Sequence, residues 1–185
     1  MPKTEKQIFM EKVTVLVDTR EQVNDHITKQ FDAWGVKYES RKLDYGDYTF
    51  IYDAVSDFSK SCVIERKANV DELYNNVVQD RGRIEKEMYA ASNQAKELIL
   101  IVESVASWDD LKNYVVPDWQ MQRDSQRKNA EIGKVVYATL RSWERGNRYR
   151  FKVEFSADKA NTAAKMLELF YYYWRNYKEQ TAARR

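Results

Sequence analysis

The sequence predicts a single α/β domain, and three observations lead to that prediction. Short apolar, β-branched runs such as Val13–Val17 alternate with longer amphipathic segments, which is typical of a sheet flanked by helices. The run Leu98–Val102 is apolar at every position, as expected of a strand that is covered on both faces. Only 5 Gly and 2 Pro occur among 185 residues, which disfavours a disordered chain or a turn-dense all-β fold.

The first half of the chain reads as strands separated by one helix. Residues 1–12 are polar and are expected to form a flexible N-terminus. After the strand at 13–17, a helix is expected to run to about Trp34, because Gly35 suits the left-handed residue that often ends a helix. Polar turns are expected to join the strands that follow. Their expected ranges are 36–43, 47–52 and 62–65 for the strands, and 44–46 and 53–60 for the turns.

The second half is expected to hold most of the helices. Asn69 and Glu72 have the spacing of a capping box, so a helix should begin there. Residues 104–130 read as an insertion with a short helix near 108–114. The remaining elements are a helix at 83–96, a strand at 98–102, a helix at 131–144, a strand at 148–155 and a closing helix at 158–177. One domain would then cover 13–178, followed by a basic tail at 179–185.

Composition excludes several classes of site. The single His26 and the single Cys62 exclude multi-histidine and cysteine-based zinc sites and an intramolecular disulfide. The sequence has no glycine-rich phosphate loop, so ATP hydrolysis is not expected. No apolar stretch is long enough to span a bilayer, so we expect a soluble, cytoplasmic protein without a membrane partner.

The net charge of +2 does not by itself predict a nucleic-acid partner, but the charges are unevenly distributed. Residues 121–152 contain nine basic and three acidic side chains, a bias typical of surfaces that face phosphates. Arg123, Arg127 and Lys128 are the candidates for DNA contact in this region. A solvated surface with a basic bias is the alternative interpretation.

Two acids and a lysine on neighbouring predicted strands form the main candidate site. Asp47 opens one strand and Glu65 lies on the next, so a hairpin can bring their carboxylates together as hard oxygen ligands for Mg²⁺. Lys67 lies two residues beyond Glu65 and therefore leaves the same face of its strand, where its ammonium can position and activate water. The alternative is a turn acid at Asp47 and a salt-bridged acid at Glu65.

The segment from Gly46 to Asp71 resembles the signature of the XPF-type structure-specific DNA nucleases. That signature is Gly-Asp, a variable segment, Glu-Arg-Lys, three residues and Asp, and every position of it is present. The resemblance implies a restriction-endonuclease-like fold, with a mixed central sheet flanked by helices. It also implies a stand-alone bacterial or phage-like endonuclease that uses Mg²⁺ or Mn²⁺ to cut branched DNA, with Asp47 and Glu65 as principal metal ligands. Arg66 would belong to the catalytic set, although a regular strand points its side chain to the opposite face, where it could be structural or reach a phosphate. Asp71 would position Lys67 or Arg66.

Two further segments are similar to elements of this family. Asp18-Thr19-Arg20-Glu21 matches an Asp-x-Arg-Glu element whose Asp approaches the metal, although Asp18 could instead cap the next helix. Arg20 is a candidate for DNA contact, and Glu21 could pair with it to support the site. The segment 83–88 resembles an Arg-Phe-x-x-Glu-Leu helix, with Ile in place of Phe. There Arg83, like the nearby Arg81, is a candidate for phosphate contact, and Glu87 could pair with Arg83 at i, i+4.

The closing helix carries an aromatic face with two interpretations. Leu167, Phe170, Tyr171 and Trp174 share one helical face, which indicates core packing. Since related nuclease domains pair through such helices, a homodimer through 158–177 is the second interpretation. Two alternatives to an independent nuclease also stay open: a catalytically silent DNA-binding or assembly subunit, and a nuclease that needs a protein partner for branch specificity. The sequence shows no helix-hairpin-helix module after Tyr177, which leaves branch preference in doubt.

Overall fold

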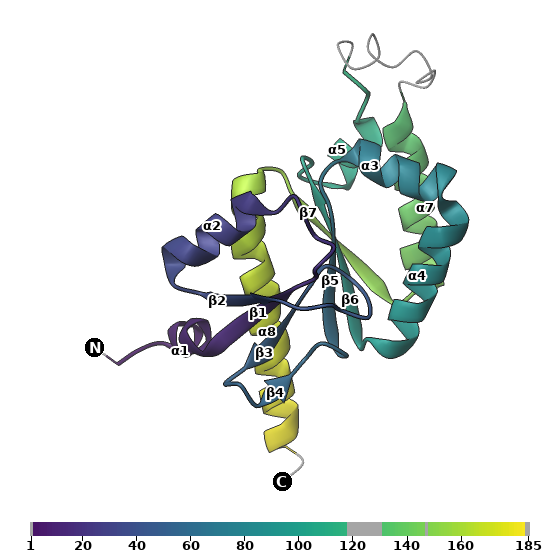
Figure 1. Cartoon of the computed structure of the whole chain (residues 1–185). Helices are drawn as coiled ribbons and strands as arrows, with labels where there is room; N and C mark the ends of the chain where they lie inside the picture. Colours follow the sequence, from purple (N-terminus) through teal and green to yellow (C-terminus); the bar gives the residue numbers. More distant parts are fainter. Residues whose placement is uncertain (1, 118–130, 147, 184–185) are drawn as a thin grey trace.

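A seven-stranded mixed sheet forms the centre of the protein in this computed structural model, which describes residues 2–117, 131–146 and 148–183 (Figure 1). The strand order is β2-β1-β3-β5-β6-β7, and β4 pairs with β3 outside this path. The strands are β1 Val13–Val17, β2 Lys37–Ser40, β3 Tyr48–Tyr52, β4 Ser56–Asp57, β5 Cys62–Lys67, β6 Glu97–Glu103 and β7 Phe151–Ser156. The predicted mixed sheet flanked by helices is therefore confirmed.

The sheet changes direction around β3, which is the part that positions the site. β3 is antiparallel to both β1 and β5, whereas β5, β6 and β7 run parallel to one another. The pairing of β3 with β5 is limited to Tyr48 opposite Ile64. The start of β3 therefore meets β5 three residues before Lys67, and this junction brings the two segments of the signature together.

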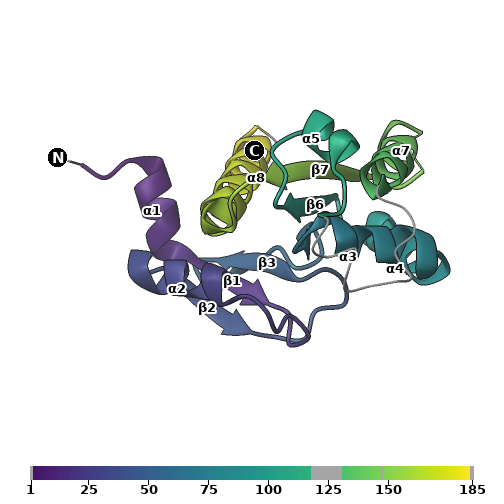
Figure 2. The ribbon, with the colours of Figure 1, turned by 90° about the horizontal axis from the view of Figure 1, so that it is seen from above.

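Helices cover both faces of the sheet (Figure 2). The first face is covered by α1 Glu5–Lys12, α2 Asp25–Trp34 and α8 Thr162–Ala182, with the short 3₁₀ turn Lys159–Asn161 leading into α8. The second face is covered by α3 Val70–Tyr74, the π-helical turn Asn75–Gln79, α4 Arg81–Gln94, α5 Trp108–Asn113 and α7 Ile132–Arg145. None of the helices in the described ranges is both long and apolar enough to cross a membrane.

The alternation of side chains along β6 divides the core into two halves. Ile99 and Ile101 pack with the first-face helices, whereas Leu98, Leu100 and Val102 pack with the second-face helices. All five side chains are buried, as the continuous apolar run predicts for a strand covered on both faces. The same alternation on β5 places Ile64 and Arg66 toward the first face, and Glu65 and Lys67 toward the second.

The predicted flexible N-terminus is wrong for most of its length. Thr4 and Gln7 form a capping box at the start of α1. Phe9 is fully buried, and its ring lies 5.5 Å from that of Tyr171 and 5.2 Å from that of Trp174 on α8. The short segment has little helical preference of its own, so its order depends on this tertiary aromatic contact, which the local sequence does not reveal.

Other boundaries differ from the predictions by smaller amounts. Gly35 ends α2 in the left-handed conformation, as predicted, and Asn69 caps α3 with its side chain. The predicted strand 36–43 is reduced to β2, and α8 extends to Ala182 through most of the predicted basic tail. The short helix expected near 108–114 is present as α5. Arg123, Arg127 and Lys128 lie outside the described residues.

The aromatic face of α8 belongs to the core. Leu167, Phe170, Tyr171 and Trp174 are all at most 7% exposed and pack with β1, β3 and α1. These four side chains are therefore not available to a second copy. Pairing through the 158–177 helix remains a prediction for the outer surface of α8, where Tyr172 and Tyr177 are exposed.

Candidate active site

A tight turn places Asp47 over the end of β5. Gly46 has φ +68°, and a Cβ at this position would lie 2.2 Å from Val63 Cγ1 and 2.9 Å from the Ile64 carbonyl oxygen. Only glycine both adopts this conformation readily and leaves room for β5. The Asp47 N–H then donates to the Ile64 carbonyl at 2.8 Å, and the Asp47 carbonyl accepts from the Asp18 N–H at 2.8 Å. The backbone of Asp47 is thus fixed between two neighbouring strands.

The Asp47 carboxylate lies in a poorly solvated and negative environment. Burial raises the pKa of Asp47 well above its usual value, and the nearby Glu65 carboxylate raises it further. The Arg66 backbone N–H donates to Asp47 Oδ2 at 2.7 Å and partly opposes this shift, as does Lys67. A divalent cation between the two carboxylates would remove their mutual repulsion.

Lys67 and Glu65 form an ion pair on the second face of the sheet. Lys67 Nζ lies 2.8 Å from Glu65 Oε1 and 3.7 Å from Glu72 Oε1. Burial lowers the pKa of Lys67, but Glu65, Glu72 and Asp47 outweigh it, so the net shift is upward. Lys67 therefore remains an ammonium at neutral pH. In this form it can hold water and balance negative charge.

The donor set fits a hard divalent cation that keeps part of its hydration shell. Within the described residues there is no group of three or more His, Cys, Asp or Glu side chains that could hold a metal. Mg²⁺ is commonly bound through only one or two carboxylates together with waters and substrate phosphates. Asp47 and Glu65 match that pattern and would hold Mg²⁺ or Mn²⁺.

Arg66 lies on the opposite face and does not point into this site. Its guanidinium donates to Glu21 Oε1 through Nε at 3.1 Å and also through Nη2. It donates as well to the Val23 carbonyl at 2.9 Å and to Glu103 Oε2 at 2.9 Å. This is the opposite-face placement that strand alternation predicts for Arg66. The side chain anchors β5 on the first face of the sheet, and its backbone N–H holds Asp47.

Glu103 is a supporting residue that the sequence analysis missed. It is fully buried at the end of β6 and accepts hydrogen bonds from Arg66 and, at 2.7 Å, from Thr162 Oγ1. His26 Nε2 lies 2.8 Å from Oε1, the same oxygen that accepts from Thr162. Strand alternation could have revealed it, because Glu103 follows Ile99 and Ile101 on one face. A carboxylate at such a buried position requires partners.

Asp18, predicted to approach the metal directly or through water, is held by hydrogen bonds within the protein. Its fully buried carboxylate accepts from the Arg20 backbone N–H at 2.8 Å, Arg20 Nε at 2.6 Å and the Leu43 N–H at 2.7 Å. Burial acts to raise the pKa of Asp18, but these hydrogen bonds together outweigh it and lower the pKa. The carboxylate is thus committed to protein donors, and it fixes Arg20.

Arg20 is held beside the two candidate metal ligands. Its pKa is raised chiefly by the hydrogen bond to Asp18 and further by Asp47 and Glu65, so it lies within the electrostatic field of both acids. The predicted Arg20–Glu21 pair is wrong, since Glu21 pairs with Arg66 and Arg20 with Asp18. The Arg20 side chain remains 64% exposed, which leaves it accessible to a phosphate.

A cavity of about 430 Å³ extends from the acids to α4. Asp47, Glu65 and Arg20 line it, together with Arg83 on α4. Arg83 pairs with Glu87 at 2.8 Å, as predicted. Arg81 is placed differently, because it pairs with Glu85 at 2.9 Å and its guanidinium carbon lies 5.8 Å from the centre of the Trp143 ring.

Asp71 connects two elements of the second face. Its Oδ2 accepts a hydrogen bond from the Tyr114 hydroxyl at 2.6 Å. Glu72, its neighbour in the first turn of α3, also approaches Lys67, and its Oε2 accepts from the Ala68 N–H at 2.8 Å. Positioning of Lys67 or Arg66 by Asp71 stays a prediction.

Comparison with known proteins places this site in a family. The model of the ERCC4 domain matches residues 17–169. XPF from Aeropyrum pernix shares the fold with a TM-score of 0.57 and 20% sequence identity, over 84% of this chain and 64% of that chain. XPF from Aeropyrum pernix in complex with DNA gives a TM-score of 0.59 and 20% identity, over 88% and 66%. No curated protein matches the sequence significantly. Because the domain model covers most of the chain, this protein belongs to the ERCC4 domain family and carries an XPF-type nuclease domain.

Proposed function

We propose that the protein is a divalent-metal-dependent endonuclease that hydrolyses phosphodiester bonds in branched DNA. The observation that carries the proposal is that two carboxylates, Asp47 and Glu65, line one cavity and that a charged lysine pairs with one of them. Lys67 Nζ lies 2.8 Å from Glu65, and Asp47 is close enough to Glu65 to raise its own pKa. Acids that repel one another in a poorly solvated recess favour the binding of a cation.

Each nearby side chain has a distinct role in this proposal. A divalent cation held by Asp47 and Glu65 would polarise the scissile phosphate and lower the pKa of a bound water. The Lys67 ammonium orients the water and stabilises negative charge as it develops on the phosphate. Arg20 and Arg83, which also line the cavity, bind the phosphates of the DNA backbone. The Arg66 backbone N–H keeps Asp47 in place.

The choice of DNA as substrate has two supports. One of the similar structures is that of an XPF from Aeropyrum pernix in complex with DNA. The nuclease signature from Gly46 to Asp71 is complete in this chain. Flaps, forks and recombination intermediates are the branched forms that the family resemblance favours.

A cleavage assay tests this function. Purified protein is incubated with end-labelled flap, fork, four-way-junction and plain duplex DNA in Mg²⁺, Mn²⁺ or EDTA, and Lys67→Ala is assayed in parallel. We expect cutting of branched forms that requires metal and is lost in the variant. Titration calorimetry with Mn²⁺ alone supplies a second readout, since binding should be strong for the wild type and weak for Asp47→Asn.

Two alternatives predict other results. A catalytically silent DNA-binding subunit would bind branched DNA without cutting it in either metal. A nuclease that depends on a partner protein would bind Mn²⁺ through Asp47 and Glu65 but cut branched and plain duplex DNA without preference.

A further inference from the structure

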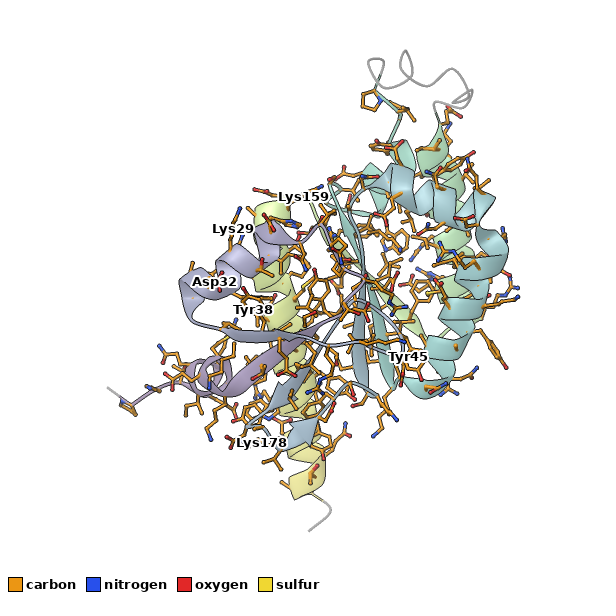
Figure 3. All side chains as sticks on the ribbon, viewed as in Figure 1. Lys29, Asp32, Tyr38, Tyr45, Lys159 and Lys178 are labelled. Carbon is orange, nitrogen blue, oxygen red and sulfur yellow. The ribbon has the colours of Figure 1, made fainter. Side chains whose placement is uncertain are left out.

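The cavity beside the acids continues well beyond the space that a metal site needs. Part of its lining comes from α4 and from the turn before β3, where Figure 3 labels Tyr45. Four apolar side chains line this part: Ile84, Met88 and Ala91 from α4, and Leu98 from β6. All are at most 5% exposed, so they form a floor rather than an outer surface. The volume of about 430 Å³ falls within the range of small-molecule sites.

Tyr45 forms one wall of this apolar part. Its hydroxyl hydrogen-bonds to the Gln94 side chain near the end of α4, so the ring spans the gap between the turn and the helix. The ring is therefore held at the cavity by a bond at its far end. A restrained aromatic ring beside an apolar floor is the kind of surface on which nucleobases stack.

The cavity lining combines groups suited to the different parts of a nucleotide. The acids Asp47 and Glu65 and the exposed Arg20 would face a cation and a phosphate. Arg83 and Lys86 add positive charge, and Asp44 and Glu87 add negative charge. The apolar floor and Tyr45 would face the flat, largely apolar base.

We propose that this cavity binds one unpaired nucleobase of the DNA strand being cut, next to the scissile phosphate. The inference rests on the proposed nuclease function and adds a substrate requirement to it. A base inside a duplex is stacked between its neighbours and cannot enter a lateral cavity unless it is extruded, which costs a few kcal/mol. A base at a flap or fork is already unpaired, so the domain itself would favour cutting next to unpaired DNA.

The proposal is tested by a thermodynamic cycle in which the Tyr45 ring and the DNA base are removed separately and together. Flap substrates carry a single abasic residue at each position near the cut, and kcat/KM is measured for the wild type and Tyr45→Ala. Loss of base–aromatic stacking should lower kcat/KM on intact DNA by roughly 5- to 150-fold. At one abasic position the wild type should show a similar loss, and Tyr45→Ala should then cause little further loss.

Two variants serve as matched controls. Tyr45→Phe retains the ring and should cleave nearly as well as the wild type. Tyr89→Ala removes an aromatic ring on α4 that is 64% exposed, and it should leave kcat/KM unchanged. Melting temperatures establish that Tyr45→Ala is folded. The proposal would be overturned if the losses in kcat/KM from Tyr45→Ala and from the abasic residue multiply at every abasic position. Wild-type activity in Tyr45→Ala would also overturn it.

A binding measurement separates this inference from the nuclease function. A single-stranded oligonucleotide containing 2-aminopurine is titrated with protein in EDTA, where no cutting occurs. Stacking in the cavity should quench its fluorescence with the wild type and Tyr45→Phe, but not with Tyr45→Ala. If the wild type cuts no DNA yet shows this pattern, the nuclease proposal fails and the base site stands. Equal quenching by all three proteins removes the base site whatever the cleavage result.

Discussion

Arg66 Nη1 donates to Glu103 Oε2 at 2.9 Å on the first face of the sheet, and the backbone N–H of the same arginine donates to Asp47 Oδ2 at the candidate site. Arg66 therefore connects the core on the first face with the candidate metal ligand. Glu103 in turn accepts from Thr162 at the start of α8. The position of Asp47 thus depends on a buried ionic network as well as on its own turn.

Removal of Glu103 should destabilise the protein strongly. Glu103→Ala leaves the Arg66 guanidinium buried with only part of its negative partner set, and loss of one member of a buried pair costs about 3–5 kcal/mol. Urea unfolding measures the change, and Glu154→Ala, which removes a partly exposed ion pair with Lys165, should cost no more than about 1 kcal/mol. Equal costs for the two variants would contradict the anchoring role of Glu103.

Asp47→Asn should stabilise the metal-free protein while abolishing cleavage. The folded-state pKa of Asp47 is raised, chiefly by burial and then by Glu65, so the folded state holds this proton more tightly than the unfolded state. Its contribution to the free energy of unfolding is therefore favourable at acidic pH and is lost as pH rises through the folded-state pKa. At neutral pH the variant should melt higher than the wild type without metal, at about 2–4 °C per kcal/mol.

The same variant should lose the response to metal. Mn²⁺ should raise the melting temperature of the wild type, because a ligand that binds only the folded state stabilises it. It should leave the melting temperature of Asp47→Asn nearly unchanged. If the metal-free wild type melts at a higher temperature than the variant at neutral pH, the predicted unfavourable effect of Asp47 on the stability of the folded state is contradicted.

Lys67→Ala should lower kcat by roughly 10²–10³-fold, the usual effect of removing one group that stabilises charge in the transition state. The KM for DNA should change little, since Lys67 lies among acids rather than on the exposed rim. Single-turnover cleavage and an independent DNA-binding titration measure the two effects. A loss confined to DNA binding would assign Lys67 to the interface instead of to the chemistry.

Gly46→Ala should disturb the site, and Gly35→Ala provides a matched control. Both glycines have positive φ, +68° and +66°, so each alanine carries a left-handed penalty of about 1–2 kcal/mol. Only at Gly46 would the added Cβ also collide with β5, since nothing lies within 4 Å at Gly35. We expect Gly46→Ala to lose more stability and to weaken Mn²⁺ binding. Similar behaviour of the two variants would show that the close approach to Val63 is not limiting.

Arg83→Ala should weaken DNA binding and reduce its dependence on salt. A side chain that neutralises one phosphate contributes about 0.9 to the slope of log affinity against log salt. Arg81→Ala, two residues away on the same helix, removes an arginine that pairs with Glu85 near Trp143 instead of lining the cavity. It should bind DNA like the wild type. An unchanged salt slope for Arg83→Ala would remove Arg83 from the DNA interface.

The candidate metal site could be predicted from the sequence because its parts are local. Strand alternation alone predicts that Glu65 and Lys67 share one face, and Gly46 indicates the turn that carries Asp47. The apolar run of β6 likewise predicts a strand covered on both sides. These inferences depend only on backbone geometry and periodicity, which act over a few residues.

The roles of the surrounding charges could not be predicted in this way. Asp18, Arg20, Glu21 and Arg66 all occur in recognisable segments, yet their pairing depends on how α2 and the turn at Leu43 pack onto the sheet. Glu103 is 37 residues from Arg66 in sequence, and Phe9 is more than 160 residues from Tyr171. The sequence by itself thus determined the mixed sheet and pointed to the three residues of the candidate metal site. Only the tertiary structure decided which charges support that site and where a cavity opens beside it, because buried charges and rings take their partners from distant segments brought together by packing.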